Sequence, residues 1–142
     1  MIYSLGLRST ALTTGLASLT LLTAASQRSI IQEIGVFLAA AAASVFAFGR
    51  PAANGVTPAA TNLFQAEDPS SVPAVSGGVL AWTTAPTAPT LAQRRWSGPA
   101  TIGVGVIFTF PRGILVAVSS NYVVHNLAAT VAASDIYMTE DE

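Results

Sequence analysis

Residues 34–56 read IGVFLAAAAASVFAFGRPAANGV, and the fold depends on whether this stretch spans a membrane or lies inside a folded protein. The run from Ile34 to Gly49 carries no charge but is only 16 residues long. A spanning helix needs about 20 mainly apolar residues, and the five central alanines add little to membrane insertion. We therefore expect the stretch to be part of a folded protein that has no membrane partner.

Helix propensity and sequence pattern disagree over the alanines at the centre, Ala39–Ala43. Alanine is the best helix former and is depleted in strands. The preceding residues Ser29–Leu38, however, place apolar side chains on both faces, as a covered strand does. Val45, Phe46 and Phe48 give Ser44–Gly49 the character of a second strand, which Arg50-Pro51 ends. We predict two strands joined by a compact connection or a single helical turn.

In the rest of the chain, Gly, Pro and polar residues separate short apolar segments. Further strands are predicted at residues 16–24, 62–65, 79–83, 104–110, 114–118, 121–127 and 136–139. This spacing predicts an all-β fold, an antiparallel β-sandwich or jelly roll of about eight short strands, in a single domain over residues 1–142. Residues 84–99 are expected to be irregular, Pro111–Gly113 to turn the chain, and Glu140–Glu142 to form a solvated terminus.

The charge composition excludes some function classes. The chain has six arginines, no lysine, seven acidic residues and one histidine, for a net charge of −1. Nucleic-acid binding needs a clustered cationic face, so no nucleic-acid partner is expected. Cysteine is absent, which excludes disulfides and cysteine zinc sites. The stretch at residues 9–27 imitates a signal peptide, but Thr, Ser and Gly interrupt its apolar centre, so secretion by a cleaved signal is not expected.

A catalytic, cofactor or metal site is not predicted, and we expect the protein not to be an enzyme. His125 is the only candidate general base near neutral pH. Ser119 or Ser120 and Asp135 could complete a triad with it, but no G-x-S-x-G elbow presents a nucleophile. Gly103-Val104-Gly105 leads into a strand instead of opening a helix, so it does not predict a dinucleotide site. A structural or interface role for His125 is favoured.

Interface residues are predicted from the arginines and their aromatic neighbour. Arginine forms planar, forked pairs and is less strongly hydrated than lysine, which suits contacts between proteins. A surface poor in charge and rich in Ala, Thr, Ser and Val also suits a chain covered by copies of itself or by partners. The predicted interface residues are Arg50, Arg94, Arg95, Trp96 and His125.

Two stretches, EIGVFLAAAAASVFAFGRPAANGV at residues 33–56 and PATIGVGVIFTFPRGILVAVSSNYVVHNLA at residues 99–128, resemble a family of small virion structural proteins of tailed bacteriophages. The matching positions are Glu33, Gly35, Gly49, Arg50, Pro51, Arg94, Arg95, Gly103, Phe110 and Pro111. Phe108 stands where the family more often has Trp, and His125 where it more often has an apolar residue or Trp. The shared motifs are structural, so the resemblance implies a virion role more firmly than a position in the particle.

The leading hypothesis is a capsid decoration (cement) protein that forms a homotrimer and docks on the outer surface of a phage head. It implies the major capsid protein or another virion protein as partner, synthesis in the host cytoplasm and a final location on the capsid surface. One alternative is a tail, baseplate or head-fibre component, which copy number per virion would separate from a head protein. An alternative of another class is a small membrane protein, such as a holin.

Overall fold

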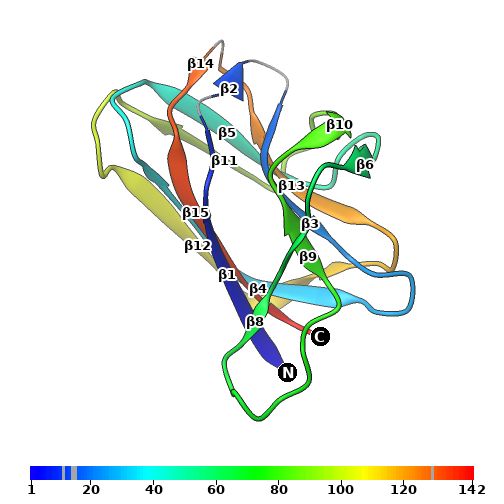
Figure 1. Ribbon diagram of the computed structural model, residues 1–142. Helices are drawn as coiled ribbons and strands as arrows, with labels where there is room; N and C mark the ends of the chain where they lie inside the picture. Colours follow the sequence, from blue (N-terminus) through cyan, green and yellow to red (C-terminus); the bar gives the residue numbers. More distant parts are fainter. Residues whose placement is uncertain (11, 14–15, 129) are drawn as a thin grey trace.

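The computed structural model describes residues 1–10, 12–13, 16–128 and 130–142, and these residues form strands, turns and loops (Figure 1). The all-β prediction is confirmed, because none of the described residues is helical. The strands are β1 (Ile2–Arg8), β2 (Leu12–Thr13), β3 (Ala17–Leu22), β4 (Ser29–Leu38), β5 (Ser44–Gly49), β6 (Val56–Pro58), β7 (Asn62–Leu63), β8 (Gln65–Ala66), β9 (Gly77–Val79), β10 (Trp82–Thr84), β11 (Arg94–Gly98), β12 (Gly105–Val116), β13 (Asn121–Asn126), β14 (Thr130–Val131) and β15 (Ser134–Asp141).

Eleven of these strands form two antiparallel sheets, and the eight main strands among them, β1, β3, β4, β5, β11, β12, β13 and β15, follow jelly-roll order. The first sheet has the order β12-β4-β15-β1-β8, and the second has the order β11-β5-β13-β3-β9-β7. Among the eight main strands the first pairs with the last and the pairing continues inward, as β1 with β15, β3 with β13, β4 with β12, and β5 with β11. This nested pairing is that of a jelly roll, which confirms the predicted sandwich of about eight strands.

The core lies between the two sheets. Along β15, Ile136 and Met138 are buried while Asp135 and Tyr137 face outward, so one face of the strand is apolar. Phe48 of β5 meets Phe108 of β12 edge to face, with ring centroids 5.1 Å apart. Because β5 and β12 belong to different sheets, this contact joins the two layers, and such an aromatic pair adds roughly 1 kcal/mol beyond its buried area.

The alanine-rich stretch forms a turn between the sheets. β4 ends at Leu38, whose amide donates to the carbonyl of Val104, and the Ala39 amide donates to the carbonyl of Ala133, 2.7 Å away. After Ala43 the chain enters β5 in the opposite sheet. The predicted strand, turn and strand are confirmed, and the small side chains let the chain cross from one layer to the other at close range.

Among the eight main strands, β1 and β11 were not predicted: β11 is the edge of the second sheet, and β1 is next to the short edge strand β8. β1 carries only Tyr3 and Leu5 as buried apolar side chains, between Ser4, Gly6 and Arg8. β11 lies in the region predicted to be irregular and exposes every side chain except Trp96 and the buried Gly98. Its register with β5, from Arg94 opposite Phe48 to Gly98 opposite Ser44, is held by backbone hydrogen bonds. Because backbone hydrogen bonds do not depend on the residue type, this pairing leaves no alternation of apolar and polar residues in the sequence.

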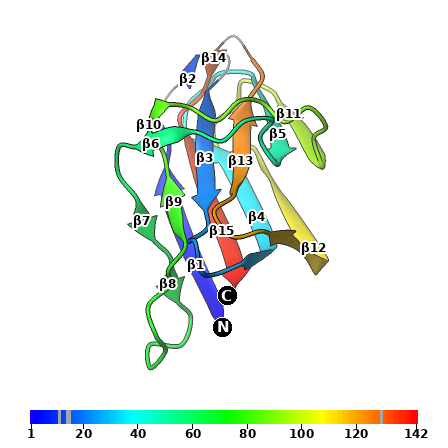
Figure 2. The ribbon, with the colours of Figure 1, turned by 90° about the vertical axis from the view of Figure 1, so that its right-hand side faces the viewer.

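Residues 50–92 contain a segment that covers the outer face of the second sheet. β6 and β10 pair with one another in this segment, in front of β3 and β13 (Figure 2). The indole of Trp82 donates to Thr20 Oγ1 of β3, and the amide of Gln93 returns the chain to β5 by donating to the carbonyl of Phe48. No strand pair of this kind lies over the first sheet among the described residues, and its outward-facing residues Gly6, Ile107 and Asp135 are exposed, so its outer face is the less covered one.

Candidate functional site

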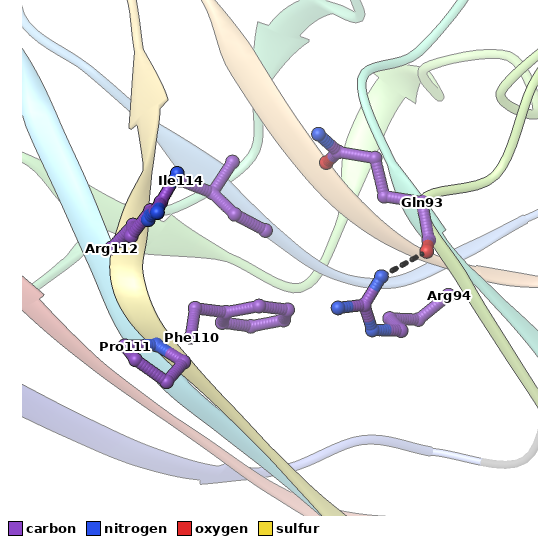
Figure 3. Close-up of a pocket in the computed structure, with 7 residues that line it drawn as sticks. Gln93, Arg94, Phe110, Pro111, Arg112 and Ile114 are labelled. Carbon is purple, nitrogen blue, oxygen red and sulfur yellow. Dashed lines mark hydrogen bonds between the residues drawn. The ribbon is translucent and has the colours of Figure 1, made fainter.

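A groove opens between the two sheets, along the side where β11 and β12 are the edge strands (Figure 3). Its volume is about 490 Å³. The lining residues come from the start of β11 and the residue before it, and from the middle of β12: Gln93, Arg94, Phe110, Pro111, Arg112, Gly113 and Ile114. Phe110 supplies an apolar floor, and the two arginines supply positive charge.

The local structure of β12 creates the groove. The register of β12 against β4 jumps from Thr109 opposite Glu33 to Ile114 opposite Ile31, so the residues between them bulge out of the ladder. Gly113 has φ +64°, which a residue with a side chain rarely adopts. The expected turn at Pro111–Gly113 is therefore wrong: these residues form a bulge within one long strand, and the bulge faces β11.

Arg94 lies over the floor of the groove. Its guanidinium carbon is 5.5 Å from the centroid of the Phe110 ring, and the two side chains point toward one another. One of its N–H groups donates to the carbonyl of Gln93, 2.8 Å away. Such a cation over an aromatic face contributes roughly 0.5–1 kcal/mol at exposed sites. The guanidinium is thereby held at the mouth of the groove.

Arg50 lies beside the groove and ties the two sheets together. It follows β5 in the second sheet and donates to the carbonyl of Leu115 in β12 of the first sheet, 2.7 Å away. Arg50 and Arg94 are both close to Tyr122: burial raises the pKa of this phenol to about 12, and the two positive charges act in the opposite direction. The structure therefore brings together two of the predicted interface residues.

Arg95 and Trp96 point to opposite faces of β11. Trp96 is half-buried and stacks on Phe46, with ring centroids 6.0 Å apart and planes 10° apart. Arg95 is exposed on the other face of the strand. Trp96 thus closes the core beneath the edge strand. The interface role of Arg95 stays a prediction.

His125 is not a surface residue of this chain. It lies on β13 between Ala47 of β5 and Ala17 of β3, and only 1% of it is exposed. Its Nδ1 lies 3.0 Å from the carbonyl oxygen of Asn126. A direct contact with another protein needs an accessible side chain, so the structure favours the structural role over the interface role that was also predicted.

The acidic C-terminal residues are held by the fold, Glu140 and Asp141 within β15 and Glu142 directly after it, which corrects the predicted solvated terminus. Glu140 belongs to β15 and is fully buried. Glu142 accepts hydrogen bonds from the amides of Val75 and Ser76. No group of three or more His, Asp or Glu side chains that could hold a metal ion was found in the described part of the chain.

A flat surface on the outer face of the first sheet is the second candidate site. Ile107, Gly35, Tyr137 and Gly6 form one row across four adjacent strands. The Tyr137 hydroxyl donates to Glu33 Oε1, 2.6 Å away. A Cβ atom built on Gly35 would lie 2.0 Å from Tyr137 Cε1, so the ring lies directly over this glycine. Glu33 and Gly35 are thus needed to lay one aromatic ring flat on the sheet.

Arg112 and Tyr137 are the site residues that the sequence analysis missed. Arg112 stands between Pro111 and Gly113 inside a strand pattern, and such a placement is a signal of a bulge. For Tyr137 no such local signal exists, because its partners Glu33 and Gly35 are about a hundred residues away in the sequence.

Comparison of the chain with protein-family models, with curated proteins and with solved structures found no match. Among the described residues, no helix is long and apolar enough to cross a membrane.

Proposed function

We propose that this chain is a structural protein of a tailed-phage particle, a decoration protein that docks on the outer surface of the head and stabilises the shell. The observation that carries the proposal is the jelly roll with an arginine-lined edge and an uncovered aromatic sheet face. Jelly rolls are common among viral coat proteins. A fold alone does not determine function, so the two surfaces and the sequence resemblance to phage virion proteins supply the remaining support.

The mechanism is mechanical and has two parts. Copies associate with one another, as a homotrimer, through the sheet edges. The uncovered outer face of the first sheet then lies on the major capsid protein or a neighbouring virion protein. Many weak and symmetric contacts add through multivalency, so occupancy is high although each contact is weak. The proposal assigns no catalysis and no cofactor to the chain.

The flat row of the first sheet supports the shell contact. Ile107 is 52% exposed, and Tyr137 is held flat beside it by Glu33 and Gly35. Exposed apolar and aromatic side chains on a rigid sheet are typical anchors of protein interfaces. By contrast, the strand pair β6–β10 of the same chain packs on the outer face of the second sheet.

The experiment is to add purified protein to phage heads that lack it, and to measure the bound copies by quantitative mass spectrometry and the temperature of DNA release. We expect hundreds of copies per head and a higher release temperature. Ile107→Glu should bind at least about tenfold more weakly, because a charge would be buried without a partner. Ile102→Glu is the matched control, since Ile102 is also exposed but lies in the loop before β12.

The copy number distinguishes the alternative position in the particle. A few copies, or a few tens, located at the tail would contradict the head proposal and favour a tail, baseplate or head-fibre component. Recovery of the chain from the host membrane, with none in purified particles, would contradict both and favour the membrane-protein alternative.

A further inference from the structure

The charges of this chain are separated onto opposite edges of the sandwich. Arg50, Arg94 and Arg112 lie at the groove, on the edge formed by β11 and β12. None of the three forms an ion pair with another residue that the structure describes. At the opposite edge of the first sheet, β8 leads into the exposed acidic pair Glu67-Asp68.

Most other acidic side chains are engaged within the chain. Asp135 forms a bidentate ion pair with Arg8, at 2.7 Å for both hydrogen bonds. Glu33 accepts from Tyr137, and Glu140 is buried. The carboxylate of Glu142 accepts from two backbone amides. Glu67-Asp68 is therefore the acidic site that is presented to the outside.

The acidic pair lies on an ordered loop. Asp68 Oδ1 accepts from the amide and the hydroxyl of Ser70, at 2.9 and 2.7 Å, and these bonds lower the pKa of Asp68. The amide of Glu67 donates to the carbonyl of Ile2, which ties the base of the loop to β1. The loop between β8 and β9 projects beyond the sheets (Figures 1 and 2). A charged, pre-ordered loop loses little conformational entropy on binding.

We propose that the arginine groove of one copy receives the Glu67-Asp68 loop of the next copy. Arginines over an aromatic floor suit carboxylates that are carried on a peptide loop. Apolar residues accompany the charges on both edges: Leu63 and Val72 near the loop are 49% and 76% exposed, and Leu115 beside the groove is 47% exposed. The contact would also cover sheet edges, whose unpaired backbone groups otherwise invite nonspecific pairing.

The two surfaces lie on opposite edges, so the contact is head-to-tail. A head-to-tail contact closes into a ring when its rotation allows closure. Every copy then contributes one groove and one acidic loop, and no edge of the first sheet is left open. The inference rests on the self-assembly included in the proposed function and names its contact, but it does not depend on which surface meets the shell.

The first test is charge reversal measured by analytical ultracentrifugation. Glu67→Arg and Arg94→Glu should each raise the dissociation constant of the assembly about tenfold or more, since close interfacial charge pairs carry at least that coupling. The double variant Glu67→Arg/Arg94→Glu should regain assembly, because both signs are exchanged within every contact. Arg95→Glu is the control: it is exposed on the same strand but points to the opposite face, and it should assemble like the unmodified chain.

A second groove variant distinguishes a weakened contact from a folding defect of Arg94→Glu. Arg112→Glu changes an exposed side chain, and it should weaken assembly as Arg94→Glu does. Circular dichroism and urea unfolding check that each variant is folded. A monomeric unmodified chain, single variants that assemble normally, or a double variant without recovery would each overturn the proposal. The last outcome would indicate that the groove receives a different protein.

The second test is disulfide crosslinking, which has no background because the chain lacks cysteine. Glu67→Cys/Arg94→Cys should form covalent chains up to the full ring under mild oxidation, on non-reducing gels. Each single variant, and the control pair Glu67→Cys/Arg95→Cys, should remain mostly uncrosslinked. Dimers from a single variant would instead show a symmetric contact and overturn the proposal. Both tests use the purified chain alone, so their failure is distinguishable from failure to bind phage heads.

Discussion

Two glycines face Tyr137 from neighbouring strands, and one of them makes room for its ring. Gly35 of β4 and Gly6 of β1 are both directly opposite Tyr137 in the sheet, but the ring lies over Gly35 alone. A Cβ atom at Gly6 would lie 3.8 Å from Tyr137 Cβ, which is an ordinary contact. Burial raises the pKa of Tyr137 to about 12, and its hydrogen bond to Glu33 acts in the same direction.

Gly35→Ala should displace the ring and break its hydrogen bond to Glu33. We expect the free energy of unfolding to fall by about 1–2 kcal/mol, the net value of such a bond together with local overpacking. The pKa of Tyr137, followed by ultraviolet absorbance, should move down toward 10. Gly6→Ala is the matched control and should change neither quantity beyond a few tenths. An unchanged pKa in Gly35→Ala would mean that the ring does not lie over this glycine.

Glu140 makes stability depend on pH in the unusual direction for a carboxyl group. Burial raises its pKa from 4.5 to about 7, against the opposing effect of the Ser29 hydroxyl. The folded chain therefore binds a proton that the unfolded chain has lost between these two values. Stability contributed by the protonated form is complete below about pH 4.5 and is lost as the pH rises toward 7.

Glu140→Gln should remove the loss of stability at high pH, because the amide has the shape of the carboxyl group but carries no charge. The difference between the two pKa values corresponds to about 3 kcal/mol. We expect the variant to be more stable than the unmodified chain at pH 8 and about equally stable at pH 4, in urea unfolding at both values. Glu67→Gln, at an exposed site, is the control and should show no such change. A variant that is less stable at pH 8 would contradict the prediction.

The bulge of β12 depends on Gly113. The steric cost of a side chain at this glycine can be separated from the cost of its left-handed backbone by comparison with Gly103. Gly113 has φ +64°, and a Cβ atom there would lie 2.1 Å from Ile30 Cγ2. Gly103 has φ +82° but no atom near its missing Cβ. Gly103→Ala therefore carries only the cost of the left-handed backbone, roughly 1 kcal/mol, whereas Gly113→Ala adds a steric clash.

We expect Gly113→Ala to lower the free energy of unfolding by about 2–3 kcal/mol, and Gly103→Ala by about 1 kcal/mol, in urea titrations of the Glu67→Arg background at protein concentrations where sedimentation shows a monomer. The background keeps assembly from contributing to the measured stability. Equal losses for the two variants would mean that the bulge relaxes around the new methyl group without cost.

Strands with a dense pattern of apolar side chains were predictable from the sequence, whereas strands held mainly by backbone hydrogen bonds were not. β4 and β5 were predicted with their observed bounds, because their apolar residues are dense and the Ala-rich turn has a clear end at Arg50-Pro51. β11 has only Trp96 as an apolar anchor, so its pairing with β5 left no periodic signal. Glu140 looked solvated beside Asp141 and Glu142, because burial depends on β1 and β4, which are distant in sequence.

The candidate site was predictable only in part, for the same reason. Arg50 and Arg94 were chosen for their residue type, and the jelly-roll pairing then brings them to one edge. His125 was chosen as the only histidine of the chain, yet it lies between β3 and β5 and is buried. Arg112 became a candidate only when the bulge placed it in the groove.

At the scale of the whole molecule, the separation of charge predicts how assembly responds to salt. The net charge of −1 is small, so long-range repulsion between copies is weak, and the local contact between the arginine groove and the Glu67-Asp68 loop should dominate the electrostatics. Screening shortens the reach of exposed charges from about 10 Å at 0.1 M salt to about 3 Å at 1 M.

The association constant of the unmodified chain should therefore fall by about tenfold or more between 0.05 and 1 M NaCl, as measured by sedimentation. The neutral variant Glu67→Gln/Asp68→Asn should associate more weakly at low salt and lose most of this dependence, because only the apolar part of the contact remains. The stability of the monomer should change little over the same range, since its core is apolar. Assembly that strengthens with salt would indicate a contact driven by the apolar residues of the edges, with the arginines outside it.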